Sequence, residues 1–272
     1  MKLGLVIDLD TCVGCHACAV ACKEWNGQSL MAGGAPDYAT QGAEPSGLWF
    51  NRVRHFEVSA VESRSNVSMD PGVGPTLKPI DIQLAAVRDI KAGGCSKTVN
   101  VPMSCMHCED ADCVTVCPTG ASYKRAEDGI VLIDPDKCMG CNYCSWACPY
   151  GARELDQNEG VMRKCTLCVD RIYDQALPET ERQPACVLAC PTHARHFGDF
   201  DDPHSKVSIL SLAREGEGML PELGYKPVNR YLPPRAMPAI DTSSVQALSK
   251  VALKERLANT KIGQFINRMV SL

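Results

Sequence analysis

The most informative part of the sequence is Cys138-Met139-Gly140-Cys141-Asn142-Tyr143-Cys144-Ser145-Trp146-Ala147-Cys148-Pro149. Its cysteines follow the spacing C-x2-C-x2-C-x3-C, and a proline comes directly after the last of them. Such close spacing bends the chain into a tight loop that directs three thiols toward one centre. The fourth cysteine lies beyond that loop and is expected to point to a different centre.

The same arrangement recurs along the chain, so that sixteen of the 17 cysteines fall into four groups of four, and Cys95 is left over. Group one repeats the spacing of residues 138–148, which form group three. Group two has four residues between its middle members, and group four is split by a long insert. The groups are Cys12, Cys15, Cys18 and Cys22; Cys105, Cys108, Cys113 and Cys117; Cys138, Cys141, Cys144 and Cys148; and Cys165, Cys168, Cys186 and Cys190.

Length and composition limit the class of protein that can carry these groups. The chain has 272 residues, 45% of them hydrophobic and 22% charged, which excludes a disordered or fibrous protein. Its formal net charge of −4 disfavours a nucleic-acid-binding protein. The apolar run after Met1 is too short for a secretory signal, and no stretch reaches the 18 apolar residues of a membrane span. We therefore expect a soluble chain whose export, if any, would depend on a partner.

The cysteines admit three interpretations. A cubane iron–sulfur cluster binds one thiolate at each of four irons, which suits the three closely spaced cysteines and the cysteine–proline endings. Zinc is also bound by four cysteines, but it favours two separated pairs, and only the split fourth group fits that pattern. Disulfides are uncommon in a chain without an export signal. The spacing favours iron–sulfur clusters.

An internal repeat pairs the groups. The stretch from Ile7 to Cys22 reappears from Ile133 to Cys148, and the end of group two resembles the end of group four. Repeats of this kind indicate duplicated structural units. Groups two and three lie close together, with Ile130–Ile133 as an expected strand between them, and therefore form one unit. Groups one and four then form a second unit around it.

In two-cluster ferredoxins the fourth cysteine of each group binds the neighbouring cluster, and this rule predicts four [4Fe–4S] clusters. The predicted ligands are Cys12, Cys15, Cys18 and Cys190 for cluster 1; Cys165, Cys168, Cys186 and Cys22 for cluster 2; Cys138, Cys141, Cys144 and Cys117 for cluster 3; and Cys105, Cys108, Cys113 and Cys148 for cluster 4.

The expected fold class is α+β, with two fused ferredoxin-like units, loop insertions and a C-terminal helical tail. Residues 1–25 and 160–235 form the first unit, and residues 95–159 form the second unit, which is inserted into it. Residues 26–94 are an insertion that contains an expected strand over 48–58. Residues 236–272 form a tail with a basic amphipathic helix, suited to an anionic membrane surface, a partner or its own subunit.

The four-group pattern resembles the iron–sulfur subunits of the molybdopterin (DMSO reductase) oxidoreductase family. Within that family it is most similar to the iron–sulfur subunit of membrane-bound sulfite dehydrogenases. The likeness extends from residue 1 to about residue 235. The stretches that carry it begin at Cys12, Leu48, Pro118 and Lys164, and they read CVGCHAC, LWFNRV, PTGASYKR and KCTLCVDRIY.

The resemblance implies that this chain is a non-catalytic electron-transfer subunit, with no catalytic residue and no small-molecule substrate of its own. It implies a molybdopterin-containing catalytic subunit as one partner and an integral-membrane, quinone-reactive subunit as the other. The group-one cluster would face the former and the group-two cluster would lie nearest the latter. The implied reaction is oxidation of sulfite to sulfate, with quinone as the acceptor.

Alternatives remain for the substrate and for the class of protein. The same subunit type occurs with dimethyl sulfoxide, polysulfide, tetrathionate and nitrate reductases. The expected location is the inner face of the cell membrane, with a periplasmic location after co-export as the alternative. A zinc-binding interaction module is the alternative from another class. Lysines near the cysteines are expected to offset the negative charge of bound clusters; they are Lys23, Lys97, Lys124, Lys137 and Lys164.

Overall fold

The computed structural model describes residues 1–27, 49–58 and 97–235. The chain divides into two units, Met1–Arg235 and Ala236–Leu272, and the second lies outside the described residues. The predicted C-terminal helix, most of the predicted insertion and Cys95 also lie outside them. None of the helices in the described part of the chain is both long enough and apolar enough to cross a bilayer.

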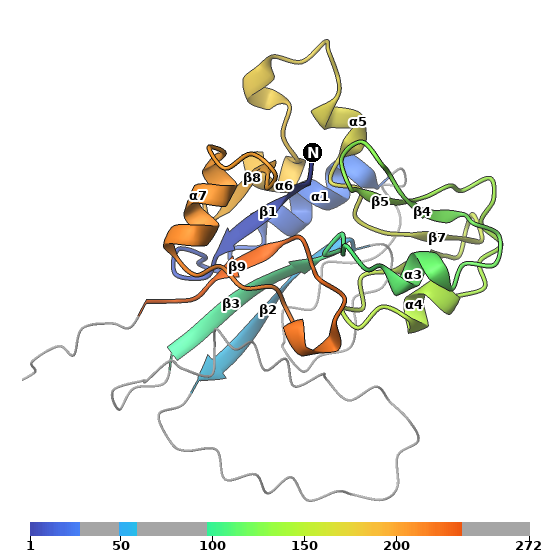
Figure 1. The fold of residues 1–272 in the computed structure, drawn as a ribbon, viewed down its shortest axis with the longest axis horizontal. Helices are drawn as coiled ribbons and strands as arrows, with labels where there is room; N and C mark the ends of the chain where they lie inside the picture. Colours follow the sequence, from blue (N-terminus) through green and yellow to red (C-terminus); the bar gives the residue numbers. More distant parts are fainter. Residues whose placement is uncertain (28–48, 59–96, 236–272) are drawn as a thin grey trace, which may run out of the picture. The chain divides into compact units, whose positions relative to one another are not determined.

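A three-stranded sheet forms the centre of the described unit (Figure 1). Its middle strand, β1 (Leu3–Asp8), pairs antiparallel with β8 (Arg195–Asp199) and parallel with β9 (Arg230–Leu232). All six residues of β1 are buried, because both faces of the sheet are covered. Val6 packs on the side of helix α7 (Lys206–Ala213), while Leu5 and Ile7 point into the main hydrophobic core.

Three antiparallel strand pairs complete the sheets. Strand β2 (Asn51–Val58) pairs along its whole length with β3 (Lys97–Ser104), which confirms the strand predicted within 48–58 from Asn51 onward. Strand β4 (Ser122–Lys124) pairs with β5 (Val131–Ile133), the strand expected between groups two and three. Strand β6 (Glu154–Asp156) pairs with β7 (Val161–Arg163), a hairpin that bridges the predicted boundary between residues 159 and 160.

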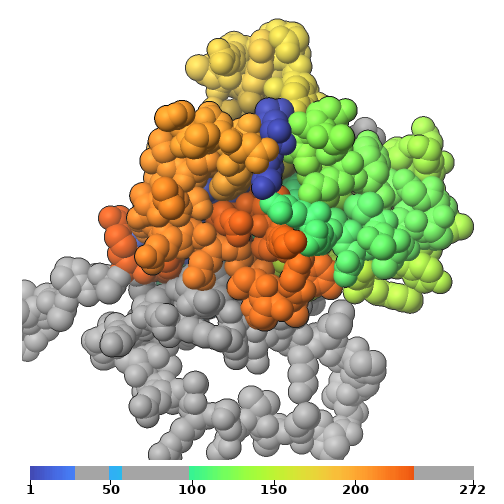
Figure 2. All heavy atoms as spheres, viewed as in Figure 1, coloured from blue at the N-terminus to red at the C-terminus, as the bar shows by residue number. Residues whose placement is uncertain are grey.

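Short helices carry the cysteine groups. They are α1 (Ala17–Asn26), α3 (Asp112–Thr115), α4 (Tyr143–Trp146), α5 (Val169–Ile172) and α6 (Ala185–Leu188), with 3₁₀ turns at η1 (Glu179–Glu181) and η2 (Pro221–Leu223). Helix α1 packs against α6, and α3 packs against α4, so group one meets group four and group two meets group three. The insert of group four, between α5 and α6, projects from the body of the unit (gold, Figure 2).

The observed fold is therefore α+β, as predicted, with small strand pairs that support short cysteine-bearing helices. The sheet also connects to the β2–β3 pair through Tyr231, which is fully buried. Its hydroxyl donates to the carbonyl of Pro102 on β3 at 2.8 Å. This bond connects the unit's central sheet to the strand that leads directly into group two.

Candidate metal centres

Each cysteine group begins with a loop whose backbone is left-handed. The residue before the second cysteine has a positive φ in all four groups: 70° at Gly14, 46° at His107, 67° at Gly140 and 55° at Leu167. Glycine adopts this conformation without steric cost. At Gly14 a Cβ atom would also lie 2.6 Å from the side-chain oxygen of Asn100, so glycine is required there for space as well.

In three of the four groups a helix ends between the third and fourth cysteines. In groups two, three and four the third cysteine lies on a short helix, and the fourth lies just past its end, before the proline. Proline disfavours helical backbone at the preceding residue, so the chain turns there. Group one has Lys23 instead, and α1 continues to Asn26. Cys22 is consequently inside a helix, which carries it toward group four.

The four cysteines predicted for cluster 3 line a single small hollow. Cys117 comes from the end of group two, and the other three come from the loop of group three. Backbone N–H groups face two of the sulfur atoms: Ser122 donates to Cys117 Sγ and Met162 donates to Cys138 Sγ, both at 3.3 Å. Thiolates are stabilised by such donors.

Cysteines of the other three predicted sets also lie close together. For cluster 1, Cys12 lies close enough to Cys18 and Cys190 for their charges to act on it. For cluster 2, burial and then the charges of its three other predicted ligands hold the pKa of Cys22 well above the usual range. For cluster 4, burial and then its three other predicted ligands raise the pKa of Cys108 to about 12.

The donor sets fit iron–sulfur clusters chemically. Burial, followed by nearby cysteine charges, raises the pKa of Cys165 to about 12, so four such thiols would not ionise together without a positively charged group between them. Some buried hydrogen-bond donors near the cysteines also lack an acceptor among the described residues. His107 accepts a hydrogen bond from the Val131 N–H at Nδ1, so its neutral ring carries the proton on Nε2, and that buried N–H is unpaired among the described residues.

The described part of the chain gives no support for disulfides or for sites that bind a single metal ion. The sixteen cysteines there are all free thiols, without a disulfide. No group of three or more His, Cys, Asp or Glu side chains within residues 1–27, 49–58 and 97–235 is arranged to bind a single metal ion.

Comparison with known proteins agrees with this chemistry. Residues 96–200 match the 4Fe-4S dicluster domain, and residues 3–24 match a 4Fe-4S binding domain. A sulfite dehydrogenase subunit of Allochromatium vinosum is 51% identical over 86% of this chain and 84% of its own length. A putative dimethyl sulfoxide reductase iron-sulfur subunit of Halobacterium salinarum is 35% identical, over 84% and 78% of the two chains. A tetrathionate reductase subunit of Salmonella typhimurium is 31% identical, over 85% and 72%.

The chain belongs to the iron–sulfur subunits of the molybdopterin oxidoreductase family. Four [4Fe–4S] clusters are its cofactors, as the four cysteine groups predicted. The zinc-binding alternative is thereby set aside. When bound, such clusters accept and release single electrons.

The cysteine sets of this iron–sulfur subunit lie in a definite order. Cys18 of cluster 1 interacts with Cys186 of cluster 2. Cys105 of cluster 4 and Cys165 of cluster 2 interact and belong to one buried hydrophobic cluster. The predicted sets of clusters 4 and 3 adjoin where α3, which carries Cys113, meets α4, which carries Cys144. The predicted sets are therefore arranged in the order 1, 2, 4, 3, with the group-three set at the end of the row opposite group one. Nothing in the described residues shows which set lies nearest a membrane partner, so that expectation stays a prediction.

The lysines of the subunit serve different purposes. Lys164 is buried and donates to the carbonyls of Val131 and Cys165. Lys124 donates to the carbonyls of Cys108 and Glu109, while Lys137 forms an exposed ion pair with Asp134. Only some of the predicted lysines therefore lie where they can affect a cluster strongly.

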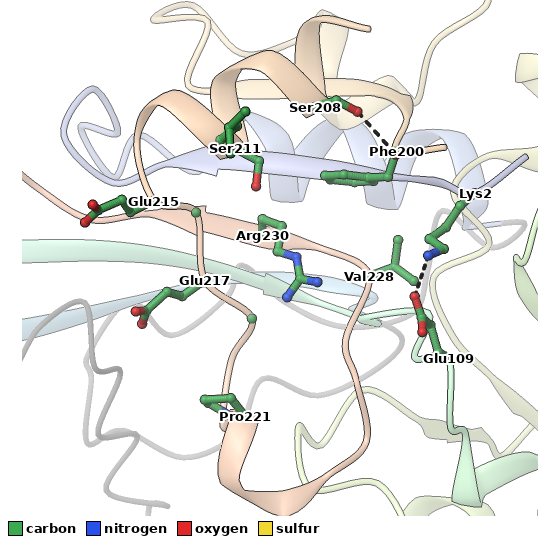
Figure 3. Close-up of a pocket in the computed structure, with 13 residues that line it drawn as sticks. Lys2, Glu109, Phe200, Ser208, Ser211, Glu215, Glu217, Pro221, Val228 and Arg230 are labelled. Atoms are coloured by element: carbon green, nitrogen blue, oxygen red, sulfur yellow. Dashed lines mark hydrogen bonds and ion pairs between the residues drawn. The ribbon is translucent and has the colours of Figure 1, made fainter. Parts of the chain in front are cut away.

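A groove of about 810 Å³ lies on another part of the subunit, between α7, β9 and the N-terminal strand (Figure 3). Lys2 and Glu109 face each other at one end, and Arg230 points into it from β9. None of its lining residues is a cysteine.

Sequence reasoning missed two buried arginines, Arg153 and Arg195. A signal for them exists in the sequence. Each follows the fourth cysteine of its group in the pattern C-P-x-x-A-R, at residues 148–153 and 190–195.

Proposed function

We propose that this chain passes electrons from a molybdopterin-containing catalytic subunit to a membrane-embedded, quinone-reactive subunit during sulfite oxidation. The observation that carries the proposal is the single row of four cysteine sets in the order 1, 2, 4, 3. A row of clusters can carry electrons between partners bound at its two ends, whereas a single buried centre could not. Sulfite is favoured by the 51% identity to a sulfite dehydrogenase subunit, against 30–35% to several reductase subunits.

The ligand sets predicted from the sequence are part of this proposal, and the proximity of the cysteines within each set supports them. The residues of this chain space the clusters, exclude water from them and donate hydrogen bonds to their sulfur atoms. In the proposed reaction sulfite and water give sulfate, two electrons and two protons. Quinone takes two electrons and two protons to give quinol.

The two ends of the row support two different contacts. At the cluster 1 end, Cys15 and Val13 are exposed. At the cluster 3 end, an exposed apolar patch consists of Met139, Tyr143 and Trp146, which are 64%, 50% and 79% exposed. Tyr143 and Trp146 also lie against each other, with ring centroids 5.7 Å apart. Exposed apolar patches are typical of protein interfaces.

We propose that the cluster 1 end contacts the catalytic subunit and the cluster 3 end contacts the membrane subunit. The complex would lie on the inner face of the cell membrane, and a periplasmic position after co-export is the alternative. A twin-arginine signal on the catalytic partner would favour that alternative.

The test is purification of the chain with its native partners, followed by assays of quinone-analogue reduction with sulfite. Sulfite-dependent activity would support the proposal. Turnover only with dimethyl sulfoxide, tetrathionate, polysulfide or nitrate as oxidant would preserve the electron-transfer role and overturn the substrate. Protease protection in intact cells against permeabilised cells would distinguish the two locations.

A further inference from the structure

A buried cation lies at each of the three junctions between neighbouring cysteine sets. Arg195, Lys164 and Arg153 are 2%, 3% and 4% exposed, respectively. In the part of the chain that the structure describes, none of these three forms an ion pair with a carboxylate. Burying an unpaired charge is costly, so a negative partner is expected beside each of them.

Arg153 connects the sets of clusters 4 and 3. Its Nη2 atom donates to Cys113 Sγ at 2.9 Å and to the hydroxyl of Ser122, also at 2.9 Å. The guanidinium interacts as well with Cys144, which belongs to the set of cluster 3. Its Nη1 atom is buried and has no hydrogen-bond partner among the described residues.

Arg195 connects the sets of clusters 1 and 2 in the same way. Nη1 of this arginine donates to the side-chain oxygen of Asn51 at 3.2 Å, which fixes the guanidinium. The charge of Arg195 acts on Cys18, from cluster 1, and on Cys186, from cluster 2. Its Nε and Nη2 atoms are buried and unpaired among the described residues.

Lys164 occupies the middle junction, between clusters 2 and 4. The carbonyls of Val131 and Cys165 accept hydrogen bonds from its ammonium and hold it in place without neutralising its charge. That charge acts on Cys165 of cluster 2 and on Cys113 of cluster 4.

We propose that Arg195, Lys164 and Arg153 are potential-tuning residues, each stabilising the reduced state of the two clusters on either side of it. An electron that arrives on a cluster adds negative charge in a buried, low-dielectric site, where a fixed cation has a large effect. Each residue therefore raises the reduction potentials of its two neighbours and lowers the repulsion between electrons on adjacent clusters. This inference rests on the proposed function only in requiring that all four sets hold clusters.

The test is an EPR-monitored redox titration of the full-length, cluster-loaded chain in the variants Arg195→Gln, Lys164→Gln and Arg153→Gln. Each is expected to shift the reduction equilibrium of its own two clusters at least tenfold toward the oxidised form, about 59 mV lower for a one-electron couple. Arg195→Gln should affect clusters 1 and 2, Lys164→Gln clusters 2 and 4, and Arg153→Gln clusters 4 and 3. Each variant is therefore a control for the other two. Arg182→Gln removes an arginine that donates to the carbonyls of Leu177 and Gln175, and it should shift none.

Unchanged potentials in variants that retain four clusters would overturn the proposal, and so would an equal shift of all four. If a glutamine variant loses iron, the charge-retaining Arg153→Lys, Arg195→Lys or Lys164→Arg is expected to restore it. Failure of that substitution to restore iron would assign the residue a purely structural role. If the unmodified complex shows no sulfite-dependent activity, the proposed function is contradicted, but the expected shifts in reduction potential are unaffected.

Discussion

The indole N–H of Trp25 on α1 donates to a carboxylate oxygen of Asp170 on α5 at a distance of 2.9 Å. The guanidinium of Arg171 lies over the same indole ring, 4.5 Å from its centroid. One residue further along α1, the amide nitrogen of Asn26 lies 3.7 Å from Cys22 Sγ and 3.9 Å from Cys168 Sγ. The helix of group one is thus fixed against group four, at the position where Cys22 joins the set of cluster 2.

Cys22→Ser should damage cluster 2 rather than the cluster in its own loop. The serine hydroxyl is a poor ligand for iron, and Cys22 lies among the thiols of group four. EPR spectra of the reduced chain should lose the cluster 2 signal and keep that of cluster 1. Cys15→Ser is the matched control, because it should affect cluster 1. Loss of the cluster 1 signal in Cys22→Ser would refute the cross-ligation.

Gly140→Ala should remove cluster 3 selectively. Gly140 has a φ of 67°, and a Cβ atom there would collide with the backbone carbonyl of Gly160. Gly120 has nearly the same φ, 66°, with no atom within 4 Å of the added carbon. Gly120→Ala should therefore cost only the left-handed strain, about 1–2 kcal/mol. Iron analysis and EPR should show loss of one cluster in Gly140→Ala and none in Gly120→Ala; equal losses would contradict this explanation.

Removal of the clusters should strongly destabilise the unit formed by residues 1–235. A ligand that binds only the folded state stabilises it, and the buried thiols have raised pKa values that oppose ionisation without metal. The loaded chain should contain about sixteen irons and about sixteen sulfides. Anaerobic chelation followed by circular dichroism should show a lower midpoint of thermal unfolding. A colourless, folded chain with about four zincs would contradict the assignment.

Trp146→Ser should weaken the contact at the cluster 3 end. Trp146 is 79% exposed, and aromatic residues dominate the binding energy of many interfaces. We expect at least a tenfold rise in the dissociation constant for the membrane subunit, about 1.4 kcal/mol. Leu212→Ser removes a side chain that is 86% exposed on α7 and should leave binding unchanged. Titration of the detergent-solubilised partner would measure both, and equal weakening would argue against this docking site.

Glu109→Gln should lower stability by at most about 1 kcal/mol at pH 7, because the ion pair with Lys2 is partly exposed. The hydrogen bond from Lys2 lowers the pKa of Glu109, so the pair's contribution is lost only as pH falls through that lowered pKa. Denaturant unfolding at pH 5 and at pH 7 should therefore give the same difference in the free energy of unfolding between the wild-type chain and Glu109→Gln. A difference that disappears at pH 5 would contradict the lowered pKa.

Much of the site could be predicted from the sequence because its signals are local. The C-x2-C spacing requires a tight loop whatever surrounds it, and Gly14 and Gly140 mark its left-handed residue. The repeat with its cysteine–proline endings indicated which groups belong together. Strands β2 and β5 were predicted from short runs of apolar or alternating residues.

Long-range packing determined the rest. The place of the cluster 4 set inside the row depends on Cys105 and Cys165, which are far apart in sequence and meet in one buried cluster with Cys22 and Phe50. Arg153 is likewise buried among residues distant in sequence, including its hydrogen-bond partners Cys113 and Ser122.

The cofactor class, the number of clusters and the turns around each cysteine could be predicted from the sequence, because they depend on residues only a few positions apart. The order of the predicted cysteine sets and the cations between them became visible only in the folded chain. Those features arise where helices from distant segments pack together, and burial there converts an ordinary arginine or lysine into a strong local charge.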